Sequence, residues 1–421
     1  MAPLAYLPYL NLSAQNFYQH ALEVAHLSFQ EKNLLLTMLA DWQIAQALLP
    51  TFPPMEYFGN ANRQQAGQKL MAYCRQYYQA WQNELPTYPL KDNHHSMLPT
   101  FGWAVSTPPV QVANNELRLG HCPVNSPQTR CCQLYTLDVV RGCPLGCAYC
   151  SLQTFSHAQE ILLTSNLKEK LDALPLPEGP IHIGTGQASD SLVWGNQHGI
   201  LQDLLAWAQE NPQVILELKT KSNQVDALLD LQRQNLVPPN VIVAWSLNPP
   251  ALAGEEPWAA SVEKRLIAAE KVAAAGIWVG FHWHPMIHYK GWEDDYACLA
   301  QEMLRRFSPE QVMMLSMGTL TYTAKVIGQI RATFLREKKS TKVLQIPWTI
   351  CGSKYSYPLA IKQEMFTQAY QLFTPWHGKV YFYLCMEDAS LSPLVGHDYQ
   401  SNEEFAEDLT RTYASRIIAQ N

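Results

Sequence analysis

The sequence predicts an α/β protein built around a partial (β/α)6 barrel of the TIM type, with a helical region before it and a small extension after it. Two observations predict this fold class. From about residue 131, short β-rich runs alternate with segments whose apolar residues recur at helical spacing. A cysteine-rich loop also follows the first of these runs directly, at the carboxyl end of a strand, where β/α barrels carry their active sites.

The N-terminal region, residues 1–87, is predicted to be helical. Apolar side chains recur at helical spacing over residues 14–49 and again over 62–84. Pro50, Pro53 and Pro54 separate the two stretches, because proline ends or interrupts a helix. Residues 88–130 then carry scattered proline, asparagine, serine and glycine, which predicts an irregular linker.

The barrel itself is predicted over residues 131–325. Six strands are expected at 134–140, 181–184, 214–218, 241–246, 278–282 and 312–316, with helices at 201–209, 225–232, 261–275 and 293–306. Six strand–helix units are fewer than the eight of a complete barrel, so an open, partial barrel is expected. The alternation is expected to end at residue 325, which leaves 326–421 as a C-terminal region.

Composition limits the possible partners and compartment. The 421 residues carry a formal net charge of −6, so nucleic-acid contact would need a local basic patch. The first residues do not read as a signal peptide, and no apolar run approaches the roughly 18 residues that span a bilayer. A soluble cytoplasmic protein without membrane contact is therefore expected. Ten cysteines in such a protein indicate metal binding or catalysis, because that compartment keeps thiols reduced.

Three of these cysteines form one motif. Cys143, Cys147 and Cys150 are spaced Cys-x3-Cys-x2-Cys immediately after the first predicted strand. Three thiolates on one loop can hold three irons of a 4Fe-4S cluster and leave the fourth iron open to a small molecule. Gly142 and Gly146 suit a loop that folds tightly around such a cluster.

A zinc site is the main alternative reading of this motif. His157 or another residue would then supply the fourth ligand. Zinc sites usually combine two cysteine pairs, or a cysteine pair with a histidine pair, and the sequence has no second pair downstream. The spacing therefore favours the iron–sulfur cluster.

The motif resembles the loop of the radical S-adenosylmethionine superfamily, which has Cys-x3-Cys-x-aromatic-Cys. Cys143, Cys147, Tyr149 and Cys150 match it. The resemblance implies a barrel of the radical SAM type with two cofactors, a 4Fe-4S cluster and S-adenosylmethionine. It further implies that an electron cleaves the sulfonium to give a 5′-deoxyadenosyl radical that abstracts hydrogen. An electron donor of the flavodoxin or ferredoxin type would then be a partner.

Over roughly residues 130–400 the chain is similar to the spore photoproduct lyase family. The matching stretches are 142–153, 188–190, 218–221, 245–248, 261–276, 279–282, 291–292, 317–320 and 383–387. The resemblance implies that Ser189, Lys221 and Ser246 contact S-adenosylmethionine and that Tyr149 is catalytic. It also implies a lyase that acts in DNA repair, with a pyrimidine photoproduct in damaged DNA as substrate.

Two departures from the family pattern bear on the substrate. Gln187 stands where the family carries the cysteine that returns a hydrogen atom to the product radical, and Ser151 stands where it has a second tyrosine. One alternative is therefore a radical S-adenosylmethionine enzyme that acts on a different, non-DNA substrate. A non-catalytic iron–sulfur or zinc-binding protein is the other.

Three further features have alternative explanations. His282 and His284 share one strand face and could chelate a metal, but a hydrogen-bonded or pocket-lining role is the preferred interpretation. Cys131 or Cys132 could supply the missing thiol, or be structural. The basic residues between 331 and 342 could contact a phosphate backbone, or form a solvated helix end. The sequence does not indicate an oligomeric state.

Overall fold

The central sheet of the protein is parallel and curled, as expected for a partial barrel. The computed structural model describes residues 3–88, 110–114, 116–122, 129–154, 161–351 and 354–420. The sheet has eight strands in the order β14-β10-β9-β8-β7-β6-β3-β2. Their bounds are Tyr381–Leu384, Val312–Thr319, Trp278–Met286, Val241–Ser246, Val214–Thr220, Ile181–Thr185, Tyr135–Leu137 and Leu119–His121. Only β2 is antiparallel to its neighbour in this described sheet, so the predicted fold class is confirmed.

Helices cover the outer face of this sheet. They are α6 (Ile200–Glu210), α7 (Asp226–Arg233), α8 (Val262–Ala274), α9 (Trp292–Arg306) and α11 (Leu359–Leu372). Outward-facing strand residues such as Leu216, Val243 and Phe281 belong to the same apolar core as these helices. Strands buried on both faces read as continuous apolar runs, which is why the strand positions were predictable.

The inner face is covered by the C-terminal helix α12 (Asn402–Gln420). A second core joins Phe405, Leu409 and Tyr413 of this helix to Ile215 and Met314 of the strands. Farther along the same strands the inward-facing residues become polar, and they include Lys219, Ser246, His282 and Ser316. The carboxyl ends of the strands are therefore the polar part of the barrel, where ligands bind in folds of this kind.

Three parts of the chain differ from the sequence-based expectation. The linker predicted over 88–130 contains β2 and β1 (Val110–Ala113), although residues 89–109, 115 and 123–128 lie outside the described part. The strand predicted at 134–140 is divided, because β4 (Val140–Arg141) leaves the barrel and pairs with β5 (Ile161–Thr164). The alternation also does not end at residue 325, since β14 adds a further parallel strand beside β10. The domain bounds remain predictions.

The rest of the described C-terminal region forms a small layer beside the barrel. Strands β11 (Thr321–Thr323), β13 (Lys354–Ser356) and β12 (Thr349–Cys351) make a three-stranded antiparallel sheet. Helix α10 (Ala324–Arg336) follows β11. Outside this region, the short helix α5 (Leu167–Asp172) packs on α6.

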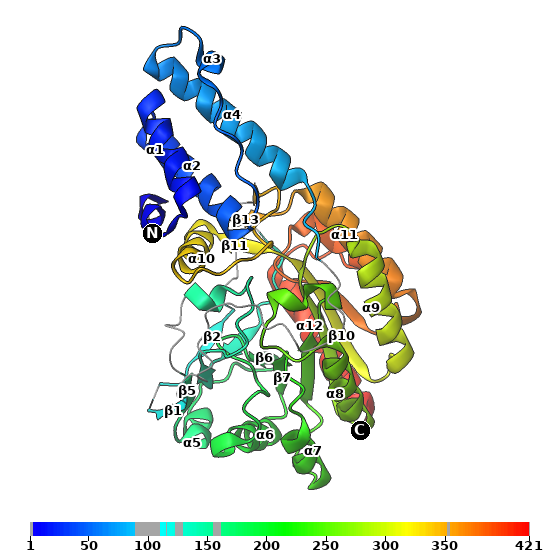
Figure 1. Ribbon diagram of the computed structural model, residues 1–421. Helices are drawn as coiled ribbons and strands as arrows, with labels where there is room; N and C mark the ends of the chain where they lie inside the picture. Colours follow the sequence, from blue (N-terminus) through cyan, green and yellow to red (C-terminus); the bar gives the residue numbers. More distant parts are fainter. Residues whose placement is uncertain are drawn as a thin grey trace.

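The N-terminal region is helical, as predicted. It comprises the 3-10 turn η1 (Pro3–Tyr9) and helices α1 (Leu12–Val24), α2 (Phe29–Ile44), α3 (Met55–Phe58) and α4 (Arg63–Asn83). Ser28 and Asn62 begin α2 and α4 with capping boxes, which satisfy free amides of the first helical turn. Figure 1 shows these blue helices projecting from one end of the α/β body, with α10 between them and the barrel.

A buried ion pair fastens this region to α10. The guanidinium of Arg331 makes two hydrogen bonds to the Asp41 carboxylate, at 2.7 and 2.8 Å, and the Tyr78 hydroxyl donates a third at 2.5 Å. Asp41 is fully buried. Although burial alone would lower the pKa of Arg331, the Asp41 charge raises it. Arg331 is therefore a structural anchor and is not available to a phosphate backbone.

Replacing Asp41 with alanine should release the N-terminal helices. The change leaves the Arg331 charge buried without a partner, which typically costs about 3–5 kcal/mol. We expect limited proteolysis to cut within α1–α4 roughly 100-fold faster, as a 3 kcal/mol change in the opening equilibrium implies. Glu23→Ala, at an exposed position of α1, should be cut at the wild-type rate. Equal rates for Asp41→Ala and wild type would contradict the anchoring role.

Candidate active site

The loop that carries the three cysteines is held from both sides. The Gly142 amide donates to the Ala188 carbonyl at 3.0 Å, beyond β6. On the other side the Ala148 amide donates to the Glu255 carbonyl at 2.8 Å, in the segment that follows β8. Gly146 adopts a φ of +64°, and a Cβ there would lie 3.0 Å from the Trp258 ring. Only glycine combines that backbone conformation with so close a neighbour.

The three thiols of this loop lie close enough to affect one another. Burial raises the pKa of Cys143 to about 12 and that of Cys147 well above its usual value, and the neighbouring thiols add to both shifts. The pKa of the Cys150 thiol is likewise raised by burial. Three adjacent thiolates that are buried or half-buried need positive charge beside them, and coordinated iron would supply it. The residues therefore fit a cluster on Cys143, Cys147 and Cys150.

The zinc alternative gains no support from the geometry. Among the described residues, no three histidine, cysteine or carboxylate side chains converge as ligands of one ion do. The suggested fourth ligand, His157, lies outside the described residues. The irons of a cluster occupy separate corners and are each held by one thiolate, so a cluster does not require such convergence.

Ser189 and Lys221 lie beside the cysteine loop, joined through Asp190. The Ser189 hydroxyl donates to the Gly142 carbonyl at 2.6 Å and accepts from Trp194 Nε1 at 3.2 Å. One oxygen of the buried Asp190 carboxylate accepts from the Lys221 amide at 2.7 Å, and the other accepts from the Thr220 hydroxyl at 2.8 Å. The end of β7 is thus fixed against the loop that begins the cysteine motif.

Tyr149 is buried within the same group. Its hydroxyl donates to the Glu256 carboxylate, and its carbonyl accepts from the Tyr322 hydroxyl at 2.7 Å. Burial and the Glu256 charge hold the pKa of Tyr149 well above its usual value. The carbonyl of Ser246 accepts from Arg265 at 2.9 Å, and Arg265 in turn pairs with Glu256. All the predicted site residues therefore lie in one region, and their contact with S-adenosylmethionine remains a prediction.

Sequence analysis did not find Glu256, Arg265 or Asn248 as individual site residues. Asn248 and Arg265 lie within stretches that resemble the family, but no periodicity singles them out. The available signal for Glu256 was the pair Glu255–Glu256 in an otherwise uncharged segment. Buried carboxylates are rare unless they are paired, and the partner becomes visible only in the folded chain.

The fold and this geometry can be compared with known proteins. The family model described as spore photoproduct lyase matches residues 124–365, which is more than half of the chain. The chain belongs to the spore photoproduct lyase family.

Individual relatives of the family are distant. Spore photoproduct lyase of Clostridium acetobutylicum is 25% identical over 181 residues, which cover 41% of this chain and 52% of the relative. The Bacillus subtilis protein of the same name is 28% identical over 176 residues, or 40% of this chain and 50% of the relative. The chain thus spans about half the length of the curated relatives it matches.

Solved structures of the family share the fold. A spore photoproduct lyase double mutant with bound AdoMet and dinucleoside spore photoproduct matches with a TM-score of 0.53 and 22% identity, covering 65% of this chain and 80% of that one. Spore photoproduct lyase complexed with dinucleoside spore photoproduct matches with a TM-score of 0.52 and 22% identity, covering 65% and 81%.

Gln187, expected from the family resemblance to stand in place of the hydrogen-donor cysteine, lies just after β6. With its amide oriented to satisfy both polar atoms, its oxygen accepts from Lys219 Nζ at 3.0 Å and its nitrogen donates to the Gly184 and Thr185 carbonyls at 2.9 and 3.2 Å. The same Lys219 charge acts on the thiols of Cys132 and Cys385. Gln187 therefore holds Lys219, whose charge acts on these thiols.

The surroundings of these inner thiols disfavour the thiolate form. A hydrogen bond with Cys131 and burial raise the pKa of Cys132 well above its usual value, and burial does the same for Cys385. Cys385 follows β14, a strand of the central sheet that sequence analysis did not predict. The hypothesis that Cys131 or Cys132 supplies a thiol stays a prediction, and Cys385 is a further candidate.

Polar side chains from β7, β9 and β10 contact one another on the inner face of the sheet. His282 Nε2 lies 2.5 Å from one oxygen of the Glu217 carboxylate, and His282 Nδ1 lies 2.5 Å from the Ser316 hydroxyl. His284 Nε2 is 3.2 Å from the same hydroxyl. Burial lowers the pKa of both histidines. The preferred interpretation of His282 as a hydrogen-bonded side chain is confirmed.

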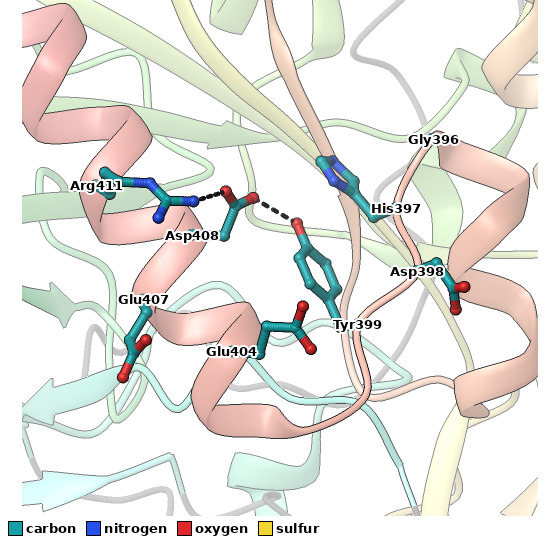
Figure 2. A pocket seen from close by; sticks show the side chains of 8 residues that line it. All are labelled: Gly396, His397, Asp398, Tyr399, Glu404, Glu407, Asp408 and Arg411. Atoms are coloured by element: carbon teal, nitrogen blue, oxygen red, sulfur yellow. Dashed lines mark hydrogen bonds and ion pairs between the residues drawn. The ribbon is translucent and has the colours of Figure 1, made fainter.

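The basic residues between 331 and 342 differ in how available they are to a nucleic acid, because Arg336 and Lys338 are exposed while the others are engaged. Arg331 is bonded to Asp41, Lys339 pairs with Glu337, and Lys342 donates to the Thr87 carbonyl at 2.7 Å. A surface hollow at the start of α12 is lined by the carboxylates of Asp398, Glu404, Glu407 and Asp408 together with Gly396, His397, Tyr399 and Arg411. Figure 2 shows Arg411 and Tyr399 bonded to Asp408. This acidic hollow shares no residue with the cysteine loop and does not suit a phosphate backbone.

No helix in the described part of the chain combines the length and apolarity needed to cross a lipid bilayer.

Proposed function

We propose that this chain is a radical S-adenosylmethionine enzyme of the lyase type that acts on a pyrimidine photoproduct in DNA. The observation that carries the proposal is the group of three thiols on one loop, of which Cys147 is buried and the other two are half-buried. This loop is fastened to the ends of β6 and β7 beside Ser189 and Lys221. When bound, a 4Fe-4S cluster with S-adenosylmethionine would supply a carbon-centred radical able to abstract hydrogen.

The chain's own residues would bind and orient the cofactor. The Lys221 ammonium, on a backbone fixed by Asp190, suits the carboxylate of S-adenosylmethionine. Ser189, after β6, and Ser246, at the end of β8, offer hydroxyl groups to the ribose. The burial of Tyr149 and Cys147 excludes water from the side where a radical would form. Reduction would come from a flavodoxin or ferredoxin type of donor.

The family supports a DNA photoproduct as substrate, since two solved relatives are described with dinucleoside spore photoproduct bound. A second candidate is a radical S-adenosylmethionine enzyme with a non-DNA substrate. Two points support it. The family resemblance implies that Gln187 stands where the family has its hydrogen donor. Arg331, Lys339 and Lys342 are engaged within the protein, while Arg336 and Lys338 of the same stretch are exposed.

Anaerobic reconstitution with iron and sulfide, followed by reduction with dithionite, tests the proposal. Wild-type protein should become brown and should convert S-adenosylmethionine to 5′-deoxyadenosine. An oligonucleotide that contains the spore photoproduct should bind more tightly than the undamaged strand and should be repaired to two thymines.

The outcomes separate the candidates. Deoxyadenosine formation without binding or repair of the damaged oligonucleotide would favour the non-DNA substrate. Reconstituted protein that holds iron but forms no deoxyadenosine, under conditions where a known family member is active, would leave a non-catalytic iron–sulfur protein. Colourless protein with one zinc per chain would support the zinc reading.

A further inference from the structure

Glu256 is a buried carboxylate that contacts three different parts of the candidate site. It follows the 3-10 turn η4 (Pro250–Glu255) and is 5% exposed. Its Oε1 accepts from the Tyr149 hydroxyl and from Asn248 Nδ2, the latter at 3.1 Å, and it lies 4.0 Å from Lys221 Nζ. Its Oε2 accepts from Arg265.

These contacts join segments that are far apart in the sequence. Tyr149 lies between the second and third cysteines of the loop, Lys221 follows β7, and Asn248 follows β8. Asn248 Nδ2 also lies 3.3 Å from the Tyr149 hydroxyl, and the Lys221 ammonium lies 5.8 Å from the centre of the Tyr149 ring. The side chains that face the cysteine loop from two strand ends therefore meet at one carboxylate.

Glu256 forms its close ion pair with Arg265, and Lys221 lies farther away, at 4.0 Å. Arg265, whose side chain is 2% exposed, forms the close ion pair with Glu256. Burial alone would raise the pKa of Glu256, but Arg265 and Lys221 lower it to about 2. The Glu256–Arg265 pair is neutral as a unit, so it places no net negative charge beside Lys221 to compete with an incoming carboxylate.

We propose that Glu256 is the positioning residue of the site, which holds the Lys221 ammonium and the Tyr149 side of the cysteine loop in fixed relation for S-adenosylmethionine. This inference rests on the proposed function. It assigns Glu256 no contact with the reacting atoms. Removing a side chain that bonds to a ligand-binding residue, without touching the ligand itself, commonly changes affinity or activity 10–100-fold.

The test compares wild type with Glu256→Gln and uses Glu387→Gln as a matched control. Glu387 is also buried and pairs with Lys362 at 2.6 Å, but it touches neither Tyr149 nor Lys221 in the described structure. After reconstitution we expect Glu256→Gln to raise the KM and the Kd for S-adenosylmethionine about 10-fold or more, with a smaller change in kcat. Glu256→Asp, which keeps the charge, should restore part of the affinity. The control should lose thermal stability but keep the wild-type KM.

Two results identify positioning as the cause. In a Lys221→Met background, Glu256→Gln should change the Kd less than it does in wild type, because one of the two groups that Glu256 positions is gone. The iron bound per chain, measured separately, should stay within about two-fold of wild type, since all three thiols remain.

Three results would overturn the inference. They are a wild-type Kd in Glu256→Gln, an equal effect of Glu256→Gln with and without Lys221, and a loss of affinity in Glu387→Gln that matches the loss in Glu256→Gln. Wild-type protein that forms no deoxyadenosine would instead remove the proposed function, and this inference with it.

Discussion

Cys147→Ala protein should emerge from anaerobic reconstitution without the brown colour of wild type and should form no detectable 5′-deoxyadenosine. Each of the three thiolates holds one iron, so a missing ligand leaves the cluster incomplete. Cys147 is also buried, and the Glu256 and Lys221 charges act on its thiol. Iron analysis, the visible spectrum and a deoxyadenosine assay measure the effect.

Cys298→Ala is the matched control for this experiment. Cys298 is an exposed cysteine of α9, and its loss should leave iron content and deoxyadenosine formation as in wild type. Cys143→Ala and Cys150→Ala should behave like Cys147→Ala. A Cys147→Ala protein with the full iron content of wild type would show that the metal is bound elsewhere.

Glu217→Gln should lower the free energy of unfolding by about 3–5 kcal/mol at neutral pH, the usual cost of breaking a buried ion pair. Glu217 has no exposed surface, Lys219 Nζ lies 3.9 Å from its carboxylate, and His282 bonds to it at 2.5 Å. His182 Nε2 lies 2.7 Å from the other oxygen. The substitution leaves the Lys219 charge in the barrel without a carboxylate, since its other partner, Gln187, is neutral.

The pH dependence of this effect has a definite sign. Burial alone would raise the pKa of Glu217, but the Lys219 ammonium and His282 hold it well below its usual value. A carboxylate with a lowered pKa in the folded state contributes stability that is complete above the unfolded pKa of about 4.3 and is lost as pH falls below it. The difference between wild type and Glu217→Gln should therefore be largest above pH about 5 and should shrink toward pH 3.

Urea unfolding at several pH values measures both the size and the direction. Glu210→Gln, at an exposed carboxylate paired with Lys168, should change the free energy of unfolding by less than about 1 kcal/mol at every pH. A Glu217→Gln difference that stays constant between pH 7 and pH 3 would contradict the charged state assigned to this carboxylate.

The cysteine loop and the strand ends show how far the sequence alone could reach. Cys143, Cys147 and Cys150 lie within eight residues, so their shared site follows from chain connectivity. Ser189, Lys221 and Ser246 each end a recognisable strand, and parallel strands bring their carboxyl ends to one edge. The buried partners of these residues could not be predicted, because nothing in local spacing pairs Glu256 with Tyr149, 107 residues away.

The sequence by itself determined the α/β class, the helical N-terminal region, six of the parallel strands and the cysteine motif, because apolar periodicity and cysteine spacing are local properties of a chain. Only the tertiary structure decided that β14 joins the barrel, that Arg331 anchors Asp41 across 290 residues, and that Glu256 links the loop to two strand ends. These pairs form because a buried charge needs a partner, and the folded topology determines which residue supplies it.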